Sequence, residues 1–206
     1  MISLIVKGGW VMVPILLGSV VALTLVLERL WYFWKIKLNA PLFAEGIFSL
    51  VEKGNVREAS EICERTRHPL ARVFMAGLER LHEEAAETER VMEREGNRQI
   101  QQVEKNLNYL VVVIGVEPLL GFLGTILGLI QAFMTWEKLA ASVTVSTLAA
   151  GIYQAMITTA AGLIIAIPYF IIYNVFLSKV NGVAQDINHY GDELLGVLGK
   201  ARRYKK

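Results

Sequence analysis

Five of the polar side chains within the apolar stretches of the sequence are the groups with which the chain could do chemistry in a membrane. They are Glu117, Thr125, Gln154, Thr158 and Thr159. Hydroxyl and amide groups line narrow wet paths or donate hydrogen bonds to a carboxylate from another chain. Neither the threonines nor Gln154 titrate near neutral pH, so a carried proton would need water, Glu117 or a partner residue.

Each of these groups also has a plainer interpretation. A threonine hydroxyl inside a helix commonly bonds the carbonyl four residues earlier, and for any single threonine this role is favoured. Three hydroxyls on two predicted spans, each beside small residues, favour a shared polar pathway. Glu117 is a functional candidate because a carboxylate near hydrocarbon is costly, and its alternative is an interfacial group held by a neighbouring cation.

Small residues recur at helical spacing around these groups. They are Gly121, Gly124 and Gly128 in one apolar stretch, and Gly151, Ala155, Gly162 and Ala166 in the next. A helix surrounded only by lipid gains nothing from such a row, whereas a closely packed helix or a lumen uses it. Glu117 shares the stripe of the three glycines that follow it, which predicts that it faces protein or water.

The composition is typical of a small membrane protein. Of 206 residues, 54% are hydrophobic, and the mean hydropathy is +0.43. The net charge of +2 is unevenly distributed and gives no reason to expect nucleic-acid binding. The single cysteine, Cys63, excludes an internal disulfide and a multi-cysteine metal site, and the sequence contains no hydrolase, Walker or dinucleotide-binding motif. We therefore expect neither enzyme activity nor a cofactor.

Three apolar stretches divide the chain, and each is long enough to span a hydrocarbon core of about 30 Å as a helix. The predicted class is an all-α membrane protein with three transmembrane helices and a large helical cytoplasmic domain. The first stretch, 10–27, is too long for a cleaved signal peptide and lacks a following cleavage site, so it predicts a retained span. The predicted segments are the amino terminus with the first span (1–34), the cytoplasmic domain (35–106), the second span (107–134), a short periplasmic loop (135–142), the third span (143–177) and a cytoplasmic tail (178–206).

The charges orient these spans. Residues 35–105 contain 12 Lys/Arg and 13 Asp/Glu, and six more basic residues lie in the tail, whereas only Lys7 and Lys138 lie on the other side. The positive-inside rule therefore places the amino terminus outside, with the large loop and the carboxyl terminus in the cytoplasm. The basic end of the tail is suited to contact with anionic membrane lipid, or is simply a solvated helix end.

Other polar residues are assigned ordinary roles. His68 and His82 lack metal-ligand spacing and are expected at the surface or at helix caps. Cys63 is expected to be a small buried thiol. Glu28 and Arg29 stand at the inner edge of the first span, where interfacial anchoring is favoured over a functional ion pair.

Three segments together resemble the MotA/TolQ/ExbB ion-channel family, closest in architecture to its ExbB and TolQ branch. They are GGWVMVPILL with ERLW in the first span, PLLGFLGTILGLIQAF in the second and GIYQAMITTAAGLIIAIPYFIIYN in the third. With the large loop after the first span, the resemblance covers nearly the whole chain. It implies a homopentamer in the bacterial inner membrane, around the single spans of an ExbD/TolR-like partner. Ions would pass an intramembrane aspartate of that partner and drive mechanical work at the cell envelope.

Carried over by position, the resemblance implies that Thr125 and Thr159 face the pore and surround the partner's aspartate. Gln154 stands where ExbB and TolQ usually carry a glutamate, and a glutamine cannot hold a proton. Glu117 stands where a small residue is usual. The adjacent Thr158 and Thr159 look like the sodium-driven branch of the family. The expected ion is therefore H⁺, with Na⁺ bound by the three threonines as the alternative.

Two other classes of function stay open. In the first, the small residues only pack helices in a membrane scaffold that conducts no ions. In the second, the chain transports a small solute, although three spans without an inverted repeat make a poor alternating-access transporter.

Overall fold

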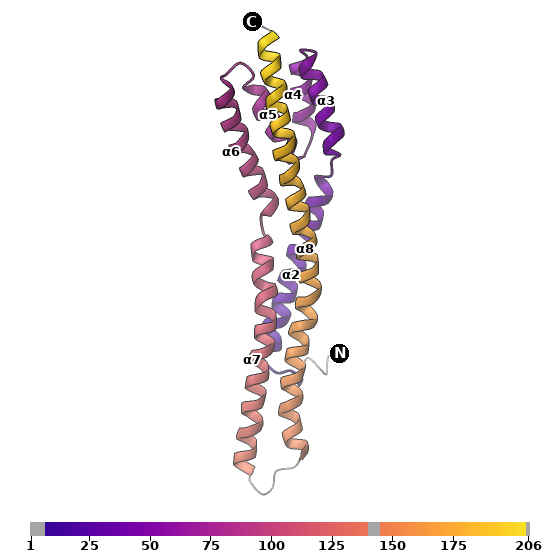
Figure 1. Ribbon diagram of the computed structural model, residues 1–206. Coiled ribbons are helices and arrows are strands. Elements are labelled where there is room, and N and C mark those ends of the chain that lie inside the picture. Colours follow the sequence, from indigo (N-terminus) through magenta and orange to yellow (C-terminus); the bar gives the residue numbers. More distant parts are fainter. Residues whose placement is uncertain (1–6, 140–144, 205–206) are drawn as a thin grey trace. The chain divides into compact units, whose positions relative to one another are not determined.

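The computed structural model describes residues 7–139 and 145–204, and every regular element in those ranges is an α-helix (Figure 1). The chain divides into two compact units. Residues 1–29 with 106–175 form what we call the apolar unit, and residues 30–105 with 176–206 form the polar unit. The helices α2 (Met12–Lys35) and α8 (Val145–Tyr204) contribute residues to both units.

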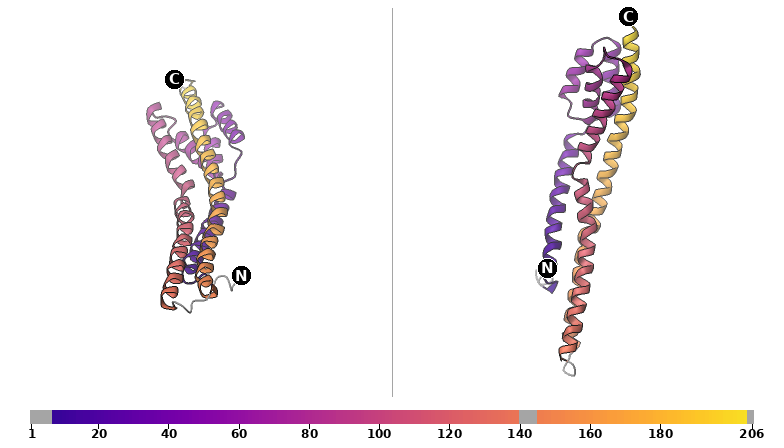
Figure 2. Two further views of the ribbon diagram at one scale, coloured as in Figure 1. Left: turned by 60° about the horizontal axis from the view of Figure 1, so that its bottom comes forward. Right: turned by 90° about the vertical axis from the view of Figure 1, so that its left-hand side faces the viewer.

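The apolar unit combines α7 (Leu107–Leu139) with the first parts of α2 and α8, which lie side by side in Figures 1 and 2. Three helical stretches among the described residues are long and apolar enough to cross a membrane. The start of α2 buries Val11, Met12 and Ile15 against the other two helices. The apolar partners on α7 and α8 are Leu120, Leu127, Ile157, Ala161 and Ile165.

The two later spans are longer as helices than the sequence predicts. α7 continues through Leu139, so residues 135–139, which were expected in a short loop, are helical. α8 has no break between the predicted third span and tail, which form one helix through Tyr204. The following parts of the predicted segments lie outside the described residues: 1–6, 140–142 of the loop, 143–144 of the third span, and 205–206 of the tail.

A turn in the chain separates α6 (Ala85–Glu104) from α7. Asn106 in this turn has φ 69°, a left-handed conformation that asparagine tolerates better than most residues. Its Nδ2 donates to Glu28 Oε2 at 3.2 Å, and the buried guanidinium of Arg29 donates to the same carboxylate. The polar sequence before the second span therefore does not run into it as one helix.

The polar unit packs α3 (Ala40–Glu52), α4 (Val56–Arg65), α5 (Pro69–Glu79) and α6 with the last part of α8. Its core includes Ile47, Leu70, Phe74, Leu194 and Leu198. Burying such side chains stabilises the unit by about 1.5–3 kcal/mol each relative to their exposed state. This core brings α5 and the end of α8 together.

Helix starts in the polar unit are specified by side chains. Asn39 Oδ1 accepts a hydrogen bond from Leu42 N at 3.4 Å at the start of α3, and a proline follows in the first turn. His68 Nδ1 accepts from Leu70 N at 3.2 Å at the start of α5, again with a proline after it. Both arrangements satisfy backbone N–H groups that have no partner within the helix. The capping role expected for a histidine is thus present at His68.

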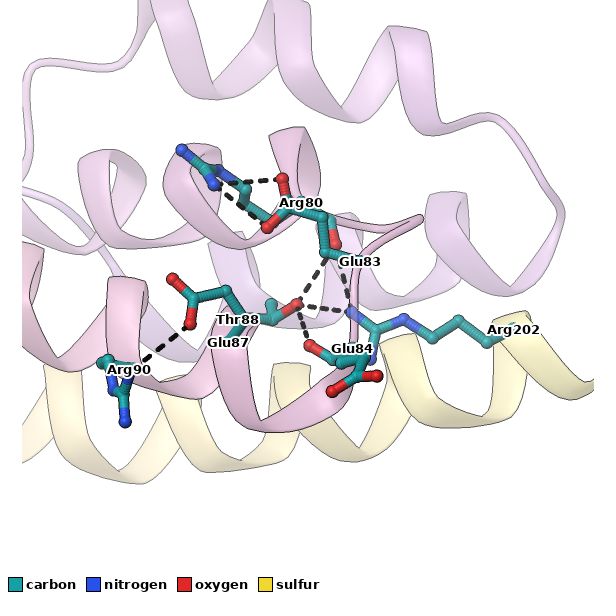
Figure 3. Close-up of polar contacts among 7 residues, drawn as sticks. All are labelled: Arg80, Glu83, Glu84, Glu87, Thr88, Arg90 and Arg202. Atoms are coloured by element: carbon teal, nitrogen blue, oxygen red, sulfur yellow. Dashed lines mark hydrogen bonds and ion pairs between the residues drawn. The ribbon is translucent and has the colours of Figure 1, made fainter.

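Near its end, α8 binds the turn that joins α5 to α6 (Figure 3). Arg202 Nε donates to Leu81 O at 2.6 Å, and its Nη2 donates to Arg80 O at 3.1 Å and to Thr88 Oγ1 at 2.6 Å. The buried Thr88 hydroxyl in turn contacts Glu84 O at 3.1 Å. The guanidinium therefore supplies a donor to Leu81 O, and at Arg80 O it joins Glu83 N, which donates at 3.0 Å.

Candidate functional site

In the apolar unit, α7 and α8 approach each other backbone to backbone. A Cβ atom on Gly121 would lie 2.9 Å from Thr158 O, and one on Gly128 would lie 2.9 Å from Gly151 O. Contacts this short do not occur for real Cβ atoms, so both positions require glycine in this packing. The other small residues at this contact are Gly124 against Thr158, Gly162 against the main chain of Glu117, and Ala155 against Gly128; Ala166 of α8 is also buried.

This close approach brings two hydroxyls together. The hydroxyl groups of Thr125 on α7 and Thr159 on α8 are hydrogen-bonded to each other. Thr159 Oγ1 also donates to Gly121 O at 3.0 Å, and Thr125 Oγ1 donates to Ala155 O at 3.1 Å. Each hydroxyl therefore reaches a main-chain carbonyl of the opposite helix. Both threonines are only partly buried.

The hydroxyl pair, Thr125 with Thr159, has more acceptors than protons. A third carbonyl contact runs from Thr125 Oγ1 to Gly121 O at 3.3 Å in its own helix, whereas two hydroxyls have only two protons to donate. The protons can therefore be shared among alternative acceptors by rotation of the hydroxyls. A carboxylate brought alongside would be a stronger acceptor than these carbonyls and would draw both protons toward itself.

Thr158 occupies a different place from its neighbour. Its side chain is fully buried against Gly124 of α7, where a Cβ would overlap it. Its hydroxyl donates within α8, to Ala155 O at 2.9 Å and to Gln154 O at 3.3 Å. This bond to a carbonyl of its own helix is the plainer interpretation of a threonine inside a helix. It gives the hydroxyl of Thr158 an acceptor that does not depend on a contact with Thr125 or Thr159.

Gln154 lies at a cavity near the start of α8. Its Nε2 fills the space beside Gly9, whose φ of 73° is a left-handed conformation suited to glycine. The cavity has a volume of about 720 Å³, and its polar lining comes from Lys7, Gln131, Thr135 and Gln154, together with Tyr153. It lies toward the end of α7 and the start of α8.

Glu117 is buried at the contact between α7 and α2, with 2% of its surface exposed. Its Oε1 lies in the space that a Cβ on Gly18 would occupy, and its main-chain carbonyl lies against Gly162 of α8. Its Oε2 has no hydrogen-bond partner among the residues that the structure describes. Glu117 is eight residues from Thr125, about 12 Å along the helix axis.

The structure thus divides the five candidate residues into separate groups. It brings Thr125 and Thr159 together. Thr158 shares only the Ala155 carbonyl with Thr125, and the side chains of Gln154 and Glu117 lie at other places. Sequence reasoning did not find Gly9 and Gly18, the two glycines of the amino-terminal region that make room for Gln154 and Glu117. Glycines among larger apolar residues were the available signal, since they mark places where another group comes close.

Comparison with known proteins gives consistent results. Residues 65–189 match the model of the MotA/TolQ/ExbB proton channel family. The biopolymer transport protein ExbB-like 1 of Synechocystis is 32% identical over 175 residues, which cover 84% of this chain and 68% of that protein. ExbB-like 3 of the same organism is 32% identical over 83% of this chain and 82% of its own length. The Tol-Pal system protein TolQ of Haemophilus influenzae is 37% identical over 54% of this chain and 48% of its own length.

Proposed function

The chain belongs to the MotA/TolQ/ExbB proton channel family and is a multi-pass membrane protein, and from this premise we propose that it is an ion-channel subunit coupling ion-motive force to mechanical work at the cell envelope. The proposed location is the bacterial inner membrane, with the amino terminus outside and the carboxyl terminus in the cytoplasm. The proposed assembly is a homopentamer around an ExbD/TolR-like single-span partner with an intramembrane aspartate. The observation that carries this proposal is the hydroxyl pair, Thr125 with Thr159, at the α7–α8 contact.

In the proposed mechanism, the hydroxyl pair holds the aspartate of the partner. When that carboxylate is ionised, both hydroxyls donate to it and give up their carbonyl contacts at Gly121 and Ala155. When it takes up a proton, it becomes a weaker acceptor, and the hydroxyls return to the carbonyls. The alternation between these two arrangements changes the affinity for the partner's span, which is how ion passage would be converted into movement.

H⁺ is the proposed ion, and one observation keeps Na⁺ as the second candidate. The hydroxyl oxygens of Thr125 and Thr159 meet the carbonyl oxygens of Gly121 and Ala155 in one place, and Thr158 Oγ1 shares the Ala155 carbonyl. A dehydrated Na⁺ needs several such neutral oxygens together with a carboxylate. Proton flux that persists without Na⁺ and is not slowed by its addition would favour H⁺.

Gln154 receives a limited role in this proposal. An amide cannot carry a proton, so Gln154, which lines the cavity with Lys7, would leave that task to water. We propose that this cavity is the outer entrance and that Gln154 orders water there without titrating. A relay through a carboxylate at this position, as the usual glutamate of ExbB and TolQ would allow, is therefore not part of the proposal.

The test is ion flux in liposomes that contain the full chain together with its ExbD/TolR-like partner. Replacing both hydroxyls, by Thr125→Ala with Thr159→Ala, should reduce flux at least tenfold while the complex with the partner still forms. The serine double variant, which keeps both hydroxyls, should retain most of the flux. Thr24→Ala is the matched control, because that hydroxyl bonds only Val20 O in its own helix at 2.8 Å. Undiminished flux in the alanine double variant would exclude the proposed mechanism.

The alternative of a non-conducting scaffold rests on the glycine contacts of Gly121 and Gly128, which are sufficient to explain helix packing alone. This alternative predicts stable association with the partner and no ion flux from the unaltered proteins. The same liposome measurement therefore separates the two functions.

A further inference from the structure

Glu117 is the one buried carboxylate that the described residues contain, and it lies within the apolar unit. With only 2% of its surface exposed and no partner for Oε2, an ionised carboxylate here would lack both water and a compensating charge. Such burial costs several kcal/mol, whereas a protonated carboxyl is neutral and costs much less. The surroundings therefore favour the protonated side chain.

The space for this carboxyl comes from a second helix. Gly18 of α2 has no side chain where Glu117 Oε1 lies, and Val113 of α7 lies beside the same position. From α8, Gly162 allows the main chain of Glu117 to come close. Gly18 of α2 thus makes room for the carboxyl, and Gly162 of α8 makes room for the main chain of the same residue.

Few titratable groups face this enclosure. On α8, the Tyr169 hydroxyl donates to Ser19 O at 3.3 Å, beside Gly18, and is the titratable group in the described structure that approaches from that helix. On α2, the nearest charged residues are Glu28 and Arg29, ten and eleven residues beyond Gly18 and so about 15 Å along the axis. On α7, the charged residue after Glu117 is Glu137, about 30 Å along the axis. No cation among the described residues is near enough to balance an ionised Glu117.

We propose that Glu117 is a proton-binding site inside each subunit, its carboxyl enclosed between Gly18 of α2 and its own helix, and separate from the hydroxyl pair. As a member of the proposed ion pathway it rests on the proposed function, but the site itself is complete within one chain and needs no partner carboxylate. Release of the proton leaves a charge that must be hydrated, so it requires α2 to separate from α7 at Gly18.

Infrared difference spectroscopy of the full chain in lipid nanodiscs, without any partner, tests the proton directly. The spectrum of the unaltered protein minus that of the Glu117→Gln variant should show the C=O stretching band of a protonated carboxyl at neutral pH. This band should shift in D₂O. The band should be the same in potassium and in sodium buffer. Absence of the band would show an ionised side chain and overturn the proposal, and its loss on addition of Na⁺ at fixed pH would replace the proton by a bound cation.

A second measurement tests the enclosure by Gly18. Gly18→Ala places a methyl group where Oε1 lies, so it should lower the thermal midpoint and change the band frequency. In a Glu117→Ala background, Gly18→Ala should leave the thermal midpoint unchanged, because the space is then free. Gly115→Ala is the matched control, since a Cβ there meets no atom within 4 Å. An equal fall in the thermal midpoint on Gly18→Ala in both backgrounds would show that Gly18 does not enclose Glu117.

These outcomes are independent of ion conduction. If the hydroxyl-pair variants conduct normally but the band is present, the proposed pathway fails and the proton site stands. If the band is absent while the double alanine variant abolishes flux, the proton site fails and the pathway stands.

Discussion

At the scale of single residues, neighbouring side chains of one type take different roles because of the face they occupy. Thr158 and Thr159 are adjacent in the sequence, but Thr158 packs against Gly124 and bonds its own helix, whereas Thr159 reaches across to Thr125. A helix turns about 100° per residue, so adjacent side chains cannot share a face. Only Thr159 therefore contributes its hydroxyl to the hydroxyl pair.

His68 gives the polar unit a dependence on pH. Burial lowers the pKa of His68 from 6.5 to about 4, and its unprotonated Nδ1 caps α5. The unfolded chain therefore binds a proton between these two pH values that the folded chain does not, so stability is full above about pH 6.5 and falls as the pH is lowered toward 4. We expect a loss of up to about 3 kcal/mol across this window, seen as a falling thermal midpoint in circular dichroism.

The control for this prediction is His68→Asn, which keeps a capping acceptor and removes the titration. Its stability should change less across the same window. The raised pKa of Asp186, caused by burial, acts in the opposite direction and is common to both proteins. Parallel pH profiles for the two proteins would show that His68 does not titrate as described.

At the scale of elements, the end of α8 is joined to the α5–α6 turn by polar contacts as well as by apolar packing. Leu194 and Leu198 lie in the core of the polar unit, and Arg202, one turn further on, binds Leu81 O and Arg80 O (Figure 3). A guanidinium has a planar set of donors that an ammonium lacks. The identity of Arg202, and not only its charge, should therefore matter.

We predict that Arg202→Lys destabilises the polar unit by about 1–3 kcal/mol, because Leu81 O loses the guanidinium donor and Arg80 O and Thr88 Oγ1 each lose one of their contacts. The buried Cys63, whose pKa burial raises to about 12, is unreactive in the folded unit, so its alkylation reports opening. Each 1.4 kcal/mol by which the polar unit is destabilised should accelerate alkylation of Cys63 about tenfold at constant pH. Arg57→Lys, at an exposed ion pair with Glu61, is the control and should change the rate little. Equal rates in the two variants would contradict the prediction.

The elements also show what could be predicted from the sequence. Hydropathy and helical periodicity were sufficient to predict three apolar helices. The break at Asn106 was not predictable, because its left-handed conformation is supported by Glu28, 78 residues away. The contact of Arg202 with the α5–α6 turn is likewise long-range, and no local pattern encodes it.

The same distinction applies to the candidate site. Small residues near Thr125 and Thr159 predicted close packing on two helices, but which of the threonines meet depends on how α7 and α8 are rotated against each other. The role of Gly18 depends on the register of α2 against α7. Sequence periodicity gives the face of each helix and leaves these pairwise registers undetermined.

At the scale of the whole molecule, the chain alternates between apolar segments and charged ones, and its topology is the property that can be tested first. We expect Glu137 outside the cell and Lys200 in the cytoplasm, because the basic residues concentrate in the large loop and the tail. In a Cys63→Ala background, Glu137→Cys should react with a membrane-impermeant thiol reagent on intact cells. Lys200→Cys should react only after permeabilisation. The reverse pattern would invert the proposed orientation and place the Lys7 cavity on the cytoplasmic side.

The hydroxyl pair has a consequence for protein engineering. Two of the oxygen atoms around it, Gly121 O and Ala155 O, belong to the main chain and are present whatever side chains are chosen. Side-chain libraries at Thr125 and Thr159 therefore sample only part of the coordination environment. Altering ion preference by design would also require re-spacing the two backbones, through the volume of the residues at 121, 128 and 155.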